Sequence, residues 1–311
     1  MELFLQNMQT AAQQVFILYI MVAVGFIADR LNVFTEKTAR ASNDLLFYIV
    51  NPCVIVNSFL NTPFTAESGK GFAIAMGCSA IAHLTGILFS IPLFNKKNKD
   101  NSAIFKYACV YGNVGYMVLP LANSILGSTG VFLCSGAVVV FNTLGFTHGI
   151  WLMNRGKDVK FELKSLILNP GVISVIIGLP LFLLSVKLPA IVSQPISHIA
   201  NLNTPLAMLI FGTYISKTNL KTIFRMPEQY MIILVRLIAV PAVMLVVCKL
   251  FGLDQTLTVA CMLSASAPCA NNTVMFCAKY GKDTGLASQV VAFNSFVSII
   301  TLPIMIAISQ I

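Results

Sequence analysis

Charged residues are scarce in this chain of 311 residues: Asp, Glu, Lys and Arg together make up 10% of it. A soluble globular chain carries about 25% charged residues. Hydrophobic residues make up 57% of the sequence, and its mean hydropathy is +0.83. Apolar segments of the length that a helix needs to cross a bilayer recur along the chain. The composition therefore excludes a soluble globular protein and predicts an all-α integral membrane protein.

Motifs of hydrolases and nucleotide-driven pumps are also absent. The sequence has no GxSxG nucleophile motif, no GxxxxGK[ST] phosphate loop and no pair of Asp residues deep in an apolar segment. Its eight cysteines lie inside apolar segments and lack CxxC spacing, so no metal site is expected. We therefore predict that the chain is not an enzyme, has no cofactor, and uses its cysteines as small packing residues.

Ten apolar segments are predicted to span the membrane as helices. They lie at about 14–29, 40–60, 71–94, 103–126, 130–153, 165–186, 196–216, 228–251, 255–279 and 285–309. Most of the 20 Lys and Arg residues fall in every second link between these segments. Basic residues are retained on the cytoplasmic side of a membrane. The chain is therefore predicted to lie in the cell inner (plasma) membrane with both termini outside the cytoplasm. Because these residues form no single patch, nucleic acid is not an expected partner.

An internal repeat relates the two halves of the chain at an offset of about 154 residues. Asn51-Pro52 then aligns with Asn203-Thr204-Pro205, and the glycine-flanked segment 127–130 aligns with 281–285. Because each half has an odd number of spans, the second half enters the membrane from the opposite side. We predict two inverted five-helix repeats, residues 1–154 and 155–311, in one transmembrane transporter domain.

Four predicted spans carry helix-breaking residues at matching places in the two halves. Besides the two Asn-Pro sites, the fourth span contains Gly112-Asn113-Val114-Gly115 and Pro120, and the ninth contains Ser264 to Pro268. Proline removes a backbone donor and clashes with the carbonyl four residues earlier. Helices are interrupted inside a membrane only where protein or a water-filled cavity satisfies the freed backbone groups. The pattern predicts broken helices whose ends meet near the middle of the bilayer.

Uncharged polar side chains gather at the depth of these interruptions. The candidate substrate-binding residues are Asn113, Asn123, Ser266, Asn271, Asn272, Asn51 and Asn203. Amides and hydroxyls can bind a carboxylate, and the N-terminal ends of broken helices favour anions. The residues therefore predict a site for a small organic anion. The alternative role of each single residue is to hydrogen-bond one membrane helix to another.

Few ionisable residues lie inside the predicted spans, where they are costly and usually functional. Arg236 in the eighth span is a candidate for holding substrate charge or for pairing with Asp44, and it could also extend to the interface. His83 in the third span could relay a proton or act as a hydrogen-bonded packing residue. No carboxylate lies deep in the fourth or ninth span. The residues leave open whether a proton, a sodium ion or neither is coupled to transport.

The segment from Asn113 to Leu121 resembles the fourth-span signature of the auxin efflux carrier family. Asn51-Pro52, Asn169-Pro170-Gly171 and the stretch from Ala267 to Gly281 resemble other landmarks of that family, in the same order. The resemblance covers nearly the whole chain. One departure is Val118-Leu119, which stands where a Gly-Leu or Gly-Ile pair is common.

The resemblance implies the ten-helix fold of plant PIN-type auxin carriers and bile-acid sodium symporters. In that fold the fourth and ninth spans cross at their prolines, here Pro120 and Pro268, and the substrate binds beside the crossing. One part of the protein then moves past the other in an elevator-like step. The resemblance also implies a homodimer and, from bacterial members, a substrate such as malonate or malate.

Together these features predict a secondary transporter that moves a small organic anion, such as malonate, malate or an auxin-like acid, by alternating access. The alternatives are a sodium-coupled symporter of the bile-acid type and an anion channel. Asn113 and Asn272 are the leading predicted substrate contacts. Pro120→Ala is expected to impair turnover by restoring a continuous helix.

Overall fold

The computed structural model is built from helices. It describes residues 2–62, 64–95, 99–154, 168, 170–217 and 226–310; Asn169, the start of the predicted sixth span and parts of the basic links lie outside these residues. Within the described ranges no strand occurs, and Gly112 and Cys269 form an isolated antiparallel bridge. The prediction of an all-α protein is confirmed.

Several helices are long and apolar enough to cross a membrane. In the part of the chain that the structure describes, five stretches qualify by length and composition: Glu36–Asn61, Ala66–Phe94, Val114–Leu144, Pro227–Leu250 and Thr284–Ser309. Large apolar side chains on the outer faces are exposed, among them Leu88, Ile177 and Ile300. Soluble monomers rarely expose apolar surface on this scale. The chain is therefore a multi-pass membrane protein.

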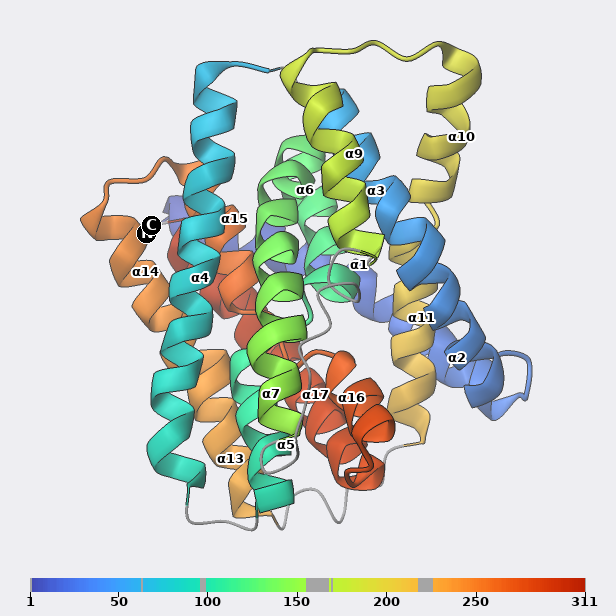
Figure 1. Ribbon diagram of the computed structural model, residues 1–311, viewed down its shortest axis with the longest axis vertical. Coiled ribbons are helices and arrows are strands. Elements are labelled where there is room, and N and C mark those ends of the chain that lie inside the picture. Colours follow the sequence, from blue (N-terminus) through green and yellow to red (C-terminus); the bar gives the residue numbers. More distant parts are fainter. Residues whose placement is uncertain are drawn as a thin grey trace.

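One set of helices, the first helix group, includes α2, α3, α9, α10 and α11, which lie on the right of Figure 1. Its members are α1 (Glu2–Arg30), α2 (Glu36–Leu45), the π-helical turn η1 (Leu46–Val50), α3 (Asn51–Asn61), α9 (Pro170–Leu183), α10 (Ala190–Ala200) and α11 (Asn203–Ser216). α3 packs against α9 and α10, and α11 packs against α1 and α2. A Cβ atom at Gly212 would lie 2.0 Å from the carbonyl oxygen of Val22, so glycine lets the backbones of α11 and α1 touch.

The second helix group contains the remaining elements. They are α4 (Ala66–Phe94), α5 (Lys99–Val110), η2 (Val114–Val118), α6 (Leu119–Leu144), η3 (Gly145–Gly149), α7 (Ile150–Met153), α13 (Pro227–Ile233), η4 (Leu234–Ala239), α14 (Val240–Leu250), α15 (Gln255–Ala265), α16 (Asn272–Tyr280) and α17 (Thr284–Ser309). α4 packs against α5, α6 and α14, and α15 packs against α6, α14 and α17. The two groups meet where α6 contacts α3 and α9, and where α17 contacts α1.

Capping residues and glycines mark several helix ends. The side chains of Thr65, Asp254 and Asp283 each accept a backbone hydrogen bond in the first turn of α4, α15 and α17. Gly281, with φ 67°, ends α16 in the left-handed conformation that glycine adopts without strain. Gly127, with φ 62°, kinks α6 within the link predicted between the fourth and fifth spans. These local signals explain why α15 and α17 begin, and α16 ends, near the predicted limits.

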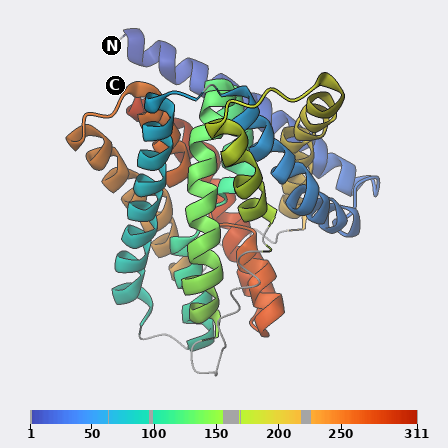
Figure 2. The same cartoon turned by 45° about the horizontal axis from the view of Figure 1, so that its top comes forward.

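Several helix ends and links lie toward opposite ends of the molecule. In Figure 1 the links from α3 to α4 and from α9 to α10 lie in the upper part of the molecule, whereas the ends of α4 and α7 and the start of α13 lie in the lower part. The N- and C-terminal ends lie close to each other in both views (Figures 1 and 2).

The eight cysteines are free thiols within the helical bundle. Cys53 is half-buried and the other seven are buried. The thiols of Cys134 and Cys269 lie within hydrogen-bonding distance of backbone carbonyl oxygens of Ala260 and Ala108. Their prediction as small packing residues is confirmed.

Candidate functional site

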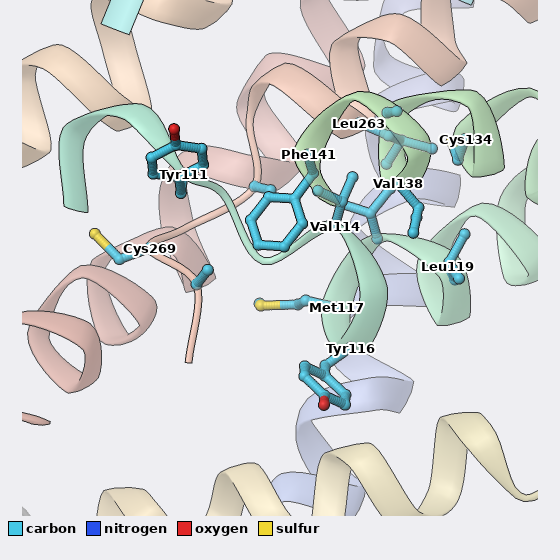
Figure 3. Close-up of a cluster of buried hydrophobic side chains, with 14 of the residues drawn as sticks. Tyr111, Val114, Tyr116, Met117, Leu119, Cys134, Val138, Phe141, Leu263 and Cys269 are labelled. Atoms are coloured by element: carbon cyan, nitrogen blue, oxygen red, sulfur yellow. The ribbon is translucent and has the colours of Figure 1, made fainter. Parts of the chain in front are cut away.

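Two broken helices cross inside the second helix group. α5 ends at Val110 and η2 begins at Val114, while α15 ends at Ala265 and α16 begins at Asn272. The backbone N–H of Asn113 donates to the carbonyl oxygen of Pro268 at 2.7 Å, and that of Ala270 donates to the carbonyl oxygen of Tyr111 at 2.9 Å. Figure 3 shows Tyr111 and Cys269 on these two extended segments. The two breaks therefore satisfy each other's backbone groups away from water.

The crossing involves Pro268 but not Pro120. Pro268 lies in the extended segment, where its missing N–H costs no helical hydrogen bond. Pro120 lies inside the continuous helix Val114–Leu144, directly after its π-helical turn Val114–Val118. A proline is tolerated inside a membrane helix where a local π-helical adjustment accommodates its missing N–H. The expected placement of Pro120 at the crossing is thus corrected by the structure.

Arg236 lies beside the crossing and is 2% exposed. Its Nε donates to the carbonyl oxygen of Ala267 at 2.7 Å, and its Nη1 to that of Val110 at 3.3 Å. Its Nη2 donates to the carbonyl oxygens of Ser264 and Ala265 at 3.3 and 3.1 Å. Asp44 is exposed on α2. Arg236 therefore neither pairs with Asp44 nor extends to the interface, and its partners are backbone groups of the broken helices.

A cavity on another side of the crossing brings three of the predicted site residues together. Asn51, Asn113 and Asn272 line it, together with Asn142 and Tyr116. We call it the asparagine cavity. Its walls come from both helix groups: α3 and α9 on one side, and η2, α6 and α16 on the other. The Oδ1 atom of Asn51 is buried and has no hydrogen-bond partner among the described residues.

Asn142 was missed by the sequence reasoning. It lies in α6 next to Phe141, is 4% exposed, and lines the asparagine cavity. The signal that could have found it is a single amide in an otherwise apolar stretch, because a buried amide without a role is costly in a membrane helix. The stretch contains no proline, and no glycine directly adjoins Asn142.

Asn123 and Asn203 lie elsewhere, in a second cavity. Asn57, Asn201 and Thr204 also line it. This second cavity is bounded by α3, α6, α10 and α11, so it too lies between the two helix groups. Leu119, which is fully buried, lines both cavities and lies between them.

The remaining candidates lie near the crossing but outside the asparagine cavity. Ser266 follows α15, and its buried hydroxyl has no partner among the described residues. Asn271 is half-buried directly before α16. His83 lines a small third cavity with Arg236 and Ser264. Its Nδ1 lies 2.7 Å from the carbonyl oxygen of Ser79, so Nδ1 carries the proton, because a carbonyl oxygen can only accept.

The broken helices give the crossing two electrostatically different sides. The N-terminal ends of α16 and of the continuous η2–α6 helix lie at the asparagine cavity, where Asn272 and Val114 form part of the wall. Helix N-termini carry partial positive charge and unpaired N–H groups. The C-terminal ends of α5 and α15 face Arg236 instead. The asparagine cavity can therefore accept an anion, and its amides can donate to a carboxylate.

These features define a class of protein: a multi-pass helical membrane protein in which polar cavities lie beside two discontinuous helices that cross. The sequence of the chain matches a family model described as membrane transport protein over residues 10–166 and 157–306. The chain belongs to this family, which confirms the resemblance to the auxin efflux carriers. It is a membrane transporter and not an enzyme.

Individual relatives are similar over almost their full lengths. An uncharacterised transporter, MJ1031, of Methanocaldococcus jannaschii is 22% identical, covering 93% of this chain and 95% of its own. A protein of Rhizobium meliloti named "Putative malonate transporter" is 23% identical and covers 90% of each chain. The uncharacterised transporter YfdV of Escherichia coli is 24% identical, covering 94% of this chain and 95% of its own.

Proposed function

We propose that this chain is a secondary transporter that moves a small monocarboxylate or dicarboxylate across the membrane by alternating access. The observation that carries the proposal is the asparagine cavity, in which four amides and two helix N-termini come together. Such a site stabilises a carboxylate through N–H donors and helix N-termini, without a charged side chain in contact with the substrate. Because no buried ion pair has to be broken, the anion can be released again. The name of the Rhizobium relative refers to malonate, a substrate of this class.

The proposed topology is ten spans in two inverted repeats, residues 1–154 and 155–311. The helices of the structure overlap the ten predicted segments, which supports this topology. We place the chain in the inner (plasma) membrane, with the basic links on the cytoplasmic side and both termini on the opposite side. The homodimer implied by the family resemblance is part of the proposal.

The proposed movement is an elevator-like displacement of the second helix group past the first. Both the asparagine cavity and the second cavity have walls from both groups, so a relative displacement would change which of them is open. The crossing lies wholly within the second group, and a rigid crossing can carry a bound anion with it. Densely packed groups shift as units more readily than they deform.

A thermal-shift screen tests the proposal directly. Purified protein is heated with malonate, malate and other organic acids, with and without sodium, because a ligand that binds the native state raises its melting temperature. Asn113→Ala and Asn272→Ala should lose the shift while melting near the wild-type temperature. Asn61→Ala, an exposed amide at the end of α3, should keep it. A full ligand shift in Asn113→Ala would remove Asn113 from the site.

Two alternatives have measurable signatures. A sodium-coupled symporter of the bile-acid type would bind its substrate only with sodium present. An anion channel would give flux that does not saturate and shows no counterflow. The proposed carrier should show saturation and counterflow in liposomes.

A further inference from the structure

The carbonyl groups around Arg236 form a cage that belongs to the two broken helices. Val110 is the last residue of α5, Ser264 and Ala265 end α15, and Ala267 belongs to the extended segment that follows. Their four oxygens lie 2.7 to 3.3 Å from guanidinium nitrogens. The last carbonyls of a helix lack intrahelical donors and carry its partial negative charge. Two such ends meet here.

This cage requires a positive group at its centre. Carbonyl oxygens turned toward each other repel, and no water of the bilayer core relieves them. Oxygen cages of this kind bind free alkali cations in other membrane proteins. Here the guanidinium supplies both the charge and the N–H donors. None of the ion pairs formed among the described residues involves Arg236.

The surrounding backbone is shaped to admit the guanidinium. Arg236 lies in the π-helical turn Leu234–Ala239, and single π-helical turns are frequent at functional sites. A Cβ atom at Gly112 would lie 2.3 Å from its Nη2, so only glycine leaves room. The third cavity, lined by His83 and Ser264, borders the guanidinium.

We propose that Arg236 is a tethered cation that occupies a monovalent-cation site built from the carbonyl ends of the two broken helices. The crossing is thereby closed without a bound metal ion. Removal of the guanidinium exposes a site that a free guanidinium ion, and more weakly sodium, can fill. Under the proposed function, a further consequence is that anion binding at the asparagine cavity needs no sodium ion at the crossing.

The test compares melting temperatures of purified wild type, Arg236→Ala, Arg236→Gln and Arg40→Ala in choline, sodium and guanidinium chloride at millimolar, non-denaturing concentrations. Arg40 is the matched control because its side chain is exposed on α2 and pairs with Glu36. Both Arg236 variants should melt roughly 10 °C below wild type in choline, because buried carbonyls lose their partner. Guanidinium should restore most of that loss, sodium part of it, and neither should raise the melting temperature of wild type or Arg40→Ala.

The proposal would be overturned if Arg236→Ala melted at the wild-type temperature, or if guanidinium raised the melting temperature of the two Arg236 variants no more than choline does. It would also be overturned if these variants could not be isolated even with guanidinium present throughout. These measurements use no organic anion, so they stand or fall separately from the proposed function. A second arm measures the malonate-induced shift of wild type in choline and in sodium. A strict sodium requirement there would contradict the sodium-free crossing, whereas no shift in either salt would count against malonate alone.

Discussion

Gly112 and Arg236 touch across the crossing, with the α-carbon of the glycine facing the guanidinium so closely that a methyl group would lie 2.3 Å from Nη2 and 2.9 Å from Cζ. The guanidinium cannot move away freely, because its hydrogen bonds fix it. Gly112→Ala should therefore destabilise the protein by roughly 1–3 kcal/mol. Thermal unfolding measures the effect. Gly77→Ala on α4 is the matched control, since its new methyl group would meet nothing within 4 Å; equal melting of the two variants would contradict the contact.

The amide of Asn142 should contribute to anion binding although no helix break marks it. It is 4% exposed and lines the asparagine cavity with Asn51, Asn113 and Asn272. A hydrogen bond to a charged group contributes about 1.5–3 kcal/mol. Asn142→Ala should thus weaken malonate affinity roughly ten- to a hundredfold by this principle, as measured by calorimetry or ligand-dependent melting. Unaltered affinity would show that the anion lies elsewhere in the cavity.

Leu119 should act as the barrier between the asparagine cavity and the second cavity. Its fully buried side chain lines both. Leu119→Ala should join the two spaces, cost about 2–5 kcal/mol of stability, and let anions leak through liposomes with flux that no longer saturates. Leu121→Ala, at a buried site of the same helix that lines neither cavity, should cost similar stability without the leak. Saturable flux in Leu119→Ala would locate the barrier at another residue.

The two prolines should differ in importance. Pro268 lies at the crossing, and its carbonyl oxygen accepts from the N–H of Asn113. Pro268→Ala frees the backbone φ angle there and adds an N–H group at the crossing, so turnover should fall at least severalfold. Pro120→Ala should leave turnover within about twofold of wild type, because the helix Val114–Leu144 already runs through that position. Uptake in liposomes compares them, and equal losses would contradict the assignment of the crossing to Pro268.

The general architecture could be predicted from the sequence because apolar length, basic links and helix breakers act locally. Asn51, Asn113 and Asn272 stand at those breakers, and they do share one cavity. The depth of a residue along a helix does not reveal which way its side chain faces. For that reason the same reasoning included Asn123 and Asn203, which lie in the second cavity instead.

The partners of Arg236 could not be predicted for a different physical reason. All four are backbone carbonyls, which every residue possesses, and the most distant of them is separated from Arg236 by 126 positions in the chain. No side-chain pattern marks such a set. The exact position of the crossing could not be predicted either. The helix break follows Val110, and the π-helical turn Val114–Val118 separates this break from Pro120.

The burial of the cysteines has a practical consequence for observing movement. Cys53 is half-buried, whereas the other seven thiols are buried and shielded from water-soluble maleimides. Replacing Cys53 alone would give a nearly silent background for spectroscopy. A pair of spin labels, one on an exposed position of α10 and one on α4, would then report the distance between the first and second helix groups. The seven buried cysteines could stay in place during this measurement.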